Sequence, residues 1–591
     1  MSIVTQSHGG DAGAPNARAL EHVRALESTP ADGDIAADER ADFGYLFPPS
    51  GDPNNYLSSD VLGQLDELAE LMVPAPGDGG PTVTPDSTLP AVLTYWGQFL
   101  DHELTARTDR DSVVSNITAA APGSSHADIE AMLKNARTPR FDLDSVYGGR
   151  ALGSGMTPQQ ARDTATVISG MRHPTLKNKM RVGTAQPDGP MPDGLDPHRD
   201  LPRFGQVSAK VREAFLRLVP ADKKAKFEAT LKKRALIGDM RNDENLIVAQ
   251  FHLSFLRFHN RVIDFLEAND TGWIADFDAA KRLTTLHYQW LIVEGFLKSI
   301  CDPAVVQRVI DNRAEHFFAF RRAYAERNGA RGLGNALPLE FSVAAYRYGH
   351  TMVRNNYDYN ANFGRPGNIL NQASFELLFR FTGGGDIFGN DRLPDNWIID
   401  WSRFVTADGN HADGLAARAA RKIDTHIAPP LETMVNEGNE EGLSDQIRAM
   451  LKSLPKRNLR RGFNLRLPTG QALHAHLRSI GAVQSQPIAD VGAILDNRPD
   501  VTAFLQGSSA RLHERTPLWF YVLAEAEAAG GNRLGELGSW IVASTFIGVL
   551  LDDPESALSI GFEPTQSPLR LPGDAPIDTI ERWMRFALVL E

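Results

Sequence analysis

The stretch "TYWGQFLDHELT", residues 94–105, combines the spacing of a half-buried helix with a cluster of polar side chains. Its apolar residues recur close to i, i+3, i+4 and i+7, which predicts a helix with one face in the core. At about 100° per residue, Gln98, Asp101 and His102 share one face, and Glu103 points about 140° away from Gln98. A polar face on such a helix is costly unless its groups are hydrogen-bonded. Two explanations therefore stand: a hydrogen-bonded core histidine, or a face that a ligand uses.

The composition of the chain is that of a globular protein with a large core. It has 591 residues, of which 42% are hydrophobic and 23% charged. The net charge of −13 argues against nucleic acid or an anionic membrane as the main partner. Cys301 is the only cysteine. An intrachain disulfide and cysteine-based zinc or iron–sulfur sites are thereby excluded.

Targeting and membrane signals are missing from the printed sequence. The first 27 residues contain no apolar h-region, so we expect no signal peptide. The longest apolar run, "WIVASTFIGVLL" (540–551), is too short to cross a bilayer. We therefore expect a cytoplasmic protein without a transmembrane segment, while export without a signal peptide stays open.

Most of the chain has a helical pattern. The run 244–268 has apolar residues on nearly all sides, which predicts a long buried helix. Residues 278–300, 374–381 and 518–529 predict further helices, and alternating strand patterns are scarce. We predict a mainly α protein with few short strands. Residues 1–45, rich in Ala, Gly and Asp at the start, are expected to form a flexible arm.

The stretch "RTPRFDLDSVYGG" (137–149) places Thr138, Arg140, Asp142 and Asp144 at every second position. This spacing lets a short loop turn several side-chain or carbonyl oxygens toward one point, as a hard cation such as calcium requires. The alternative is an exposed acidic turn, which would have the same sequence pattern.

Three more stretches carry charged or ring side chains in helix-like surroundings. In "GDMRNDENL" (238–246), Arg241 and Glu244 stand three apart at the start of the long helix, where an acid can also simply favour the helix dipole. In "AAYRYGHTMVRNNYDYN" (344–360), His350 lies in a predicted helix, three residues after Arg347 and four after Tyr346, which would share its helix face. The stretch "RNLRRGFNLRLP" (457–468) could by itself be a basic surface loop.

Taken in order, these stretches resemble the animal-type haem peroxidase family of the peroxidase–cyclooxygenase superfamily, over residues 90–560. "WGQFLDHEL" resembles the distal helix of that family, "TPRFDLDSVYG" its calcium loop, and "GDMRNDE" its distal-arginine segment. "YRYGHTMV" resembles the proximal-histidine segment, and "NLRRGFNLRLP" the proximal-asparagine segment, with Asn458 and Pro468 ten apart. "RTPLWFYVLAEAE" (515–527) resembles its C-terminal helical part. Because these motifs must converge on one cofactor, we expect one large helical domain over residues 46–591.

The resemblance implies a role for each residue of the motifs. His350 is implied as the axial ligand of haem b iron, and the side-chain oxygen of Asn458 as the acceptor on its other ring nitrogen. On the distal side, His102 is implied as the acid/base that moves the proton of hydrogen peroxide, leaving an oxidised ferryl haem. Arg241 is implied to stabilise charge on the departing oxygen, and Gln98 to line a halide pocket.

Further residues are implied to hold the cofactors. Asp101 and Glu244 match two carboxylates that form esters with haem methyl groups in vertebrate members. Asn245 follows Glu244, so an additional methionine–haem link is not expected. Glu103 stands where the family has a calcium-binding aspartate, and it is one methylene longer. The implied calcium ligands are Glu103, Thr138, Arg140, Asp142 and Asp144.

Three functions stay open. The leading one is a peroxidase that uses hydrogen peroxide to oxidise small donors such as phenols or halides. The second is a dioxygenase acting on an unsaturated fatty acid with oxygen; Arg347 stands where that branch has its radical tyrosine, which leaves Tyr346 as the best-placed candidate. The third is a non-catalytic haem-binding adhesion or sensor module. The presence of both His102 and Arg241 argues against the third function.

Overall fold

A computed structural model describes residues 41–73, 86–106, 116–118, 122–135, 137–148, 157–189, 191–192, 194–329, 335–363, 373–407, 419–434, 437–438, 443–495 and 498–590. Within these ranges the protein is mainly helical and has one hydrophobic core, which confirms the predicted fold class. The helices in the first half are α2 (Leu62–Leu71), α3 (Val92–Leu104), α4 (His126–Met132), α5 (Asp144–Tyr147), α6 (Pro158–Met171), α7 (Ala209–Leu218), α8 (Ala221–Thr230), α9 (Leu246–Ala268) and α10 (Phe277–Leu291). Those that follow are α11 (Lys298–Ile300), α12 (Pro303–Asp311), α13 (Glu315–Asn328), α14 (Phe375–Arg380), α15 (Asp445–Lys452), α16 (Leu454–Asn464), α17 (Gly470–Ser479), α18 (Pro499–Gly507), α19 (Leu518–Ala528), α20 (Glu536–Asp552), α21 (Ala557–Ile560) and α22 (Ile580–Phe586).

The strands are few and short. They are β1 (Ala41–Gly44), β2 (Asp86–Pro90), β3 (Lys134–Asn135), β4 (Leu337–Pro338), β5 (Asn356–Tyr357), β6 (Ala373–Ser374) and β7 (Ala419–Arg421). They form one three-stranded sheet in the order β3–β1–β4 and two pairs, β2–β7 and β5–β6. β1 lies within the expected arm of residues 1–45, yet it is paired in the sheet and its Phe43 is fully buried. The rest of the expected arm lies outside the described residues.

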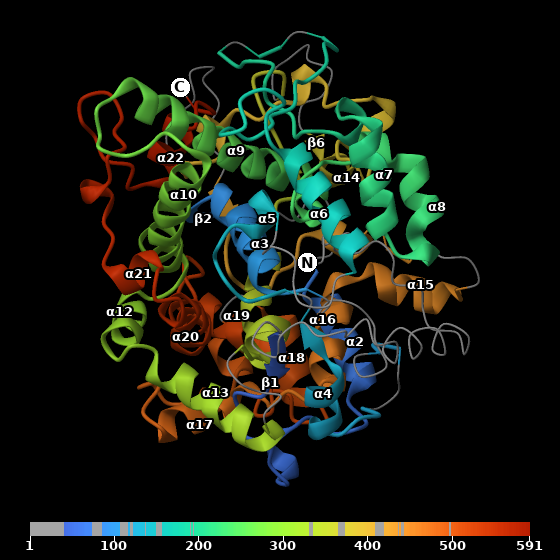
Figure 1. Ribbon diagram of the computed structural model, residues 1–591. Coiled ribbons are helices and arrows are strands. Elements are labelled where there is room, and N and C mark those ends of the chain that lie inside the picture. The colour runs from blue at the N-terminus through green and yellow to red at the C-terminus, as the bar shows by residue number, and fades with distance from the viewer. Residues whose placement is uncertain are drawn as a thin grey trace.

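The distal helix α3 lies near the centre of the molecule (Figure 1). It packs against α9, whose first turn is capped by the Asn245 side chain accepting from the N–H of Val248. The ring of Phe99 on α3 stacks on Phe255 of α9 with centroids 4.6 Å apart. Both helices are buried over most of their length, so the polar residues of α3 lie inside the protein.

The segment that carries His350 is not the α-helix that we expected. A π-helix, Glu340–Ala344, is followed by a 3-10 helix, Ala345–His350. Ala344, at the junction, has φ −126° and ψ −73°, outside the helical range. In a 3-10 helix residues three apart are aligned. The expected shared face of Tyr346 and His350 is therefore wrong, and Arg347 is the residue aligned with His350.

Within the described part of the chain, none of the helices is both long enough and apolar enough to span a bilayer. The longest predicted apolar run belongs to α20, which is buried against α12 and α13. This run is therefore part of the core.

Candidate functional site

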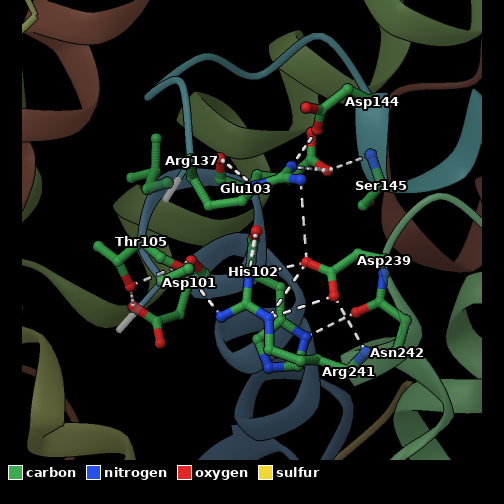
Figure 2. A network of polar contacts seen from close by, with 12 residues as sticks. Asp101, His102, Glu103, Thr105, Arg137, Asp144, Ser145, Asp239, Arg241 and Asn242 are labelled. Atoms are coloured by element: carbon green, nitrogen blue, oxygen red, sulfur yellow. Dashed lines mark hydrogen bonds and ion pairs between the residues drawn. The ribbon is translucent and has the colours of Figure 1, made fainter. Parts of the chain in front are cut away.

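His102 is fully buried on α3, and its Nδ1 lies 2.7 Å from Oδ1 of Asn242 (Figure 2). One turn earlier, Gln98 accepts a hydrogen bond of 2.8 Å from the amide of Asn245. Asp101 accepts from the hydroxyl of Thr105 at 2.7 Å. The distal helix thus presents its polar face to the segment that begins α9.

Arg241 is tied to the end of α3 by its guanidinium. Its Nη1 donates to the carbonyl of Thr105 and its Nη2 to the carbonyl of His102, both at 2.8 Å. Asp239 holds the other edge of the guanidinium in a paired contact, with Nη2 at 2.7 Å. Among the described residues these bonds engage four of the five N–H groups that a guanidinium has. The second N–H of Nη1 makes no hydrogen bond to these described residues.

Asp239 connects two buried arginines. Burial alone would raise the pKa of Asp239, but the guanidinium groups of Arg241 and Arg137 hold it below its ordinary value. Arg137 lies 3.9 Å from Asp239 on one side and contacts Asp144 on the other (Figure 2). The distal arginine and the loop that follows Arg137 are thus parts of one charge network.

On the other side of the site, Nδ1 of His350 lies 2.8 Å from the side-chain amide nitrogen of Asn458. We expected the amide oxygen at this place. The two amide atoms exchange positions by a half-turn of the side chain, so the same contact allows an acceptor on His350 Nδ1. Trp519 of α19 packs beside His350, with ring centroids 6.4 Å apart, and its indole N–H donates to the carbonyl of Arg347.

The two sides are joined by contacts between segments far apart in the sequence. Arg347, aligned with His350, lies 3.4 Å from the carboxylate of Asp101. The hydroxyl of Tyr346 donates to the carbonyl of Gly97 at 3.1 Å.

The two histidines of the site fit a haem. Each imidazole, His102 on α3 and His350 on the neighbouring 3-10 helix, has its Nδ1 beside an asparagine amide, which orients the ring so that Nε2 is the atom that can bind or react. Glu244 is also buried, three residues after Arg241 and two before the start of α9.

The predicted calcium loop lies beside α3. Carboxylate oxygens of Glu103, Asp142 and Asp144 all lie within 4.8 Å of one another, a set that fits a hard cation. Glu103 also accepts from the N–H groups of Leu143 and Ser145, at 2.9 and 3.2 Å. Burial raises the pKa of both Glu103 and Asp144, and repulsion from the neighbouring carboxylate of Asp142 adds to the rise in each.

Two of the five implied calcium ligands are not part of this carboxylate set. The N–H of Arg140 donates to the carbonyl of Thr138 at 2.8 Å, so that carbonyl is engaged within the loop. Arg137, which our reading of the sequence did not single out, brings a positive charge to the cluster and lies 3.6 Å from Glu103.

Sequence reasoning also missed Asp239, Asn242 and His252. All three are polar, fully buried and close to the distal arginine in sequence or space. The signal available was the density of polar residues in "GDMRNDEN" and a histidine inside the apolar run that follows. Asp239 is paired with Arg241 and Arg137, while Asn242 contacts the rings of His102 and His252. These partners could not be identified from that signal.

Comparison with known proteins agrees with this geometry. Residues 197–441 match the family model described as animal haem peroxidase. The chain is 27% identical over 306 residues to the peroxidase-like protein of Margaritifera margaritifera, a match that covers 48% of this chain and 34% of that protein. This chain therefore spans about a third of that relative's length.

One solved structure shares the fold at low identity. Peroxidase A from Dictyostelium discoideum superposes with a TM-score of 0.53 at 13% identity, covering 94% of this chain and 95% of that chain. Oryza sativa fatty acid alpha-dioxygenase gives a TM-score of 0.49 at 13% identity, covering 97% and 87%. The family-model match shows that residues 197–441 are similar to the animal haem peroxidase family, and the Dictyostelium structure shows the same overall fold.

Proposed function

We propose that the protein is a haem peroxidase that uses hydrogen peroxide to oxidise small donors such as phenols or halides. The observation that carries the proposal is the buried His102, held at Nδ1 by the amide of Asn242 and flanked by Arg241. A family fold alone would not support this function, because related folds host different reactions.

Each side chain has a definite task in this proposal. His350 would hold the haem, which, when bound, would take up the second peroxide oxygen and supply the two electrons that break the O–O bond, electrons that the donors then restore. His102 donates at Nδ1 and so offers a lone pair at Nε2, which takes the proton from one peroxide oxygen and returns it to the other. The remaining N–H of Arg241 stabilises the negative charge on the departing oxygen. Water is the product of that transfer. Asp101 and Glu244 are proposed as the haem-ester carboxylates.

The test is the reaction of the haem-loaded protein with peroxide and a phenol. His102→Leu should slow the reaction with peroxide about 10²–10⁴-fold while the Soret band stays, because only the acid/base is lost. His350→Ala should weaken or shift the Soret band, because the axial ligand is lost. A normal five-coordinate histidine spectrum in His350→Ala, or peroxide reactivity that His102→Leu leaves unchanged, would contradict the proposal.

We also propose that calcium binds at Glu103, Asp142 and Asp144. The proximity of three carboxylates supports the site, and the adjacent His102 explains why it would matter. Asp142→Ala, or chelation of wild-type protein, should lower the melting temperature by several degrees, since a bound ligand stabilises the folded state. If elemental analysis of the purified protein finds no calcium and added calcium has no effect, calcium does not bind, and Arg137 alone balances the negative charge of the loop.

A further inference from the structure

We infer that Asn242 and His252 are positioning residues that fix the ring tautomer of His102. The inference rests on the proposed function, because the tautomer of His102 matters only if this ring handles a proton. Neither residue belongs to the set that the resemblance implied. Both are fully buried, and each touches the other.

Asn242 reaches two rings because of the turn that carries it. The 3-10 helix Met240–Asp243 rotates about 120° per residue, so three successive polar side chains point in three directions. Arg241 points to the carbonyls at the end of α3, and Asp243 pairs with Arg203 at 2.7 Å. Asn242 points to the histidines, with Oδ1 2.7 Å from His102 Nδ1 and Nδ2 3.0 Å from His252 Nδ1.

The hydrogen-bond roles follow from the chemistry of an amide. Its oxygen only accepts, so Nδ1 of His102 must carry the proton. Its nitrogen only donates, so Nδ1 of His252 must be the acceptor, and His252 then carries its proton on Nε2. Burial lowers the pKa of His252 to about 3, so this ring is neutral and can accept.

The opposite amide orientation would exchange the tautomers of both rings. The contact lengths favour the orientation described here, because 2.7 Å is at the short end for N–H···O and would be short for a contact between two nitrogens. With the proton on Nδ1, His102 has its lone pair at Nε2. This is the state that a general base needs before peroxide arrives.

The first test reads the tautomer without relying on activity. The full chain, labelled with ¹⁵N-histidine, is loaded with diamagnetic zinc protoporphyrin in place of haem, and the His102 nitrogens are identified by comparison with His102→Leu. We expect a protonated Nδ1 and an unprotonated Nε2 in the wild type. In Asn242→Leu we expect the Nδ1 proton signal of His102 to be lost or mixed. A wild-type His102 that carries its proton on Nε2 overturns the inference.

The second test is the rate constant for the reaction of the haem-loaded protein with peroxide. Asn242→Leu should lower it about 10–100-fold, a part of what the acid/base supplies, with the Soret band and the KM for the phenol unchanged. His252→Phe keeps a ring but removes the acceptor of the Asn242 amide, so it should give a smaller loss and a mixed tautomer. If both variants react with peroxide at the wild-type rate, the positioning role is wrong.

A matched control lies on the same helix. His259 is seven residues after His252 on α9, equally buried, and bonded to Tyr147 and to the carbonyl of Asn178. His259→Phe should cost stability but leave the peroxide rate unchanged. If His259→Phe lowers the peroxide rate constant as much as His252→Phe does, the effect of His252→Phe is general destabilisation and not a positioning role. The NMR result also separates this inference from the proposed function. If His102 has the expected tautomer but the protein oxidises no phenol, only the proposed function is contradicted.

Discussion

At the residue scale, Gly238 shows how closely the loop of residues 137–148 is held against the segment that carries Arg241. A Cβ at this position would lie 2.2 Å from the carbonyl oxygen of Asp144 and 2.7 Å from that of Ser145. The neighbouring N–H of Asp239 donates to that Ser145 carbonyl at 3.0 Å. Any side chain at Gly238 must therefore push the loop away from Asp239 and the arginine that it holds.

Gly238→Ala should lower the free energy of unfolding by about 1–3 kcal/mol, the usual cost of overpacking. It should also slow the reaction with peroxide, because Asp239 shifts together with Arg241. Urea denaturation and the peroxide rate constant measure the two effects. Gly63→Ala is the control: it lies on the exposed side of α2 with nothing near its Cβ, so it should be neutral or stabilise by up to about 1 kcal/mol. Equal stability of the two variants would contradict the argument.

Single residues of the site could be predicted where a motif carries them, as with His102 on α3 or His350. Asn242 and Arg137 could not, because the roles of these residues depend on partners more than 30 residues away, His102 for one and Glu103 for the other. A sequence pattern reports which face of an element is buried. It does not report which buried polar groups meet.

At the element scale, Glu340 ties the N-terminal segment to the helix that leads to His350. It is fully buried at the start of the π-helix and accepts from the N–H groups of Leu46 and Phe47, both at 2.9 Å. Burial raises its pKa to about 7, despite these two hydrogen bonds. The folded state therefore binds a proton more tightly than the unfolded state does, and this group's contribution to stability is full below pH 4.5 and lost as the pH rises through 7.

Glu340→Gln should remove that pH dependence, because the amide does not titrate. The difference in free energy of unfolding between wild type and Glu340→Gln should fall by about 3 kcal/mol from pH 4.5 to pH 8, following from about 1.4 kcal/mol per pKa unit. Urea denaturation at both pH values measures it, with the exposed Glu326→Gln as a control that should parallel the wild type. A difference that stays constant with pH would show that folding does not raise the pKa of Glu340.

Elements with a long apolar period were predicted within two residues of their observed ends, as α9 and α19 show. The predicted helix 278–300 is α10 and α11 with a π turn, Ile292–Leu297, between them. The segment before His350 departs further, since its hydrogen-bond pattern changes from π to 3-10 at Ala344. Periodicity cannot separate these helix types over six residues, and packing between α16, α19 and α20 decides the local geometry.

At the scale of the whole molecule, the contact between Tyr346 and Gly97 indicates how the alternative function, a fatty-acid dioxygenase, should be tested. A fatty-acid dioxygenase needs a tyrosine beside the haem that can abstract hydrogen from a lipid chain. Tyr346 instead packs between Phe341 and Phe546, at 4.9 and 5.2 Å, and its hydroxyl is bonded to a main-chain carbonyl of α3. The 3-10 helix turns it about 120° away from His350. This environment supports a structural role that joins the two sides of the site.

Tyr346→Phe should therefore keep the oxidation of phenol by peroxide near the wild-type rate. It should cost about 1 kcal/mol of stability, because one buried hydrogen bond is lost and the carbonyl of Gly97 loses its donor. Neither protein should consume oxygen with linoleate. Oxygen electrode traces with linoleate and phenol assays with peroxide, run on both proteins, measure these outcomes. Rapid oxygen uptake by the wild type that disappears in Tyr346→Phe, while phenol oxidation survives, would make Tyr346 the radical residue and the protein a lipid oxygenase.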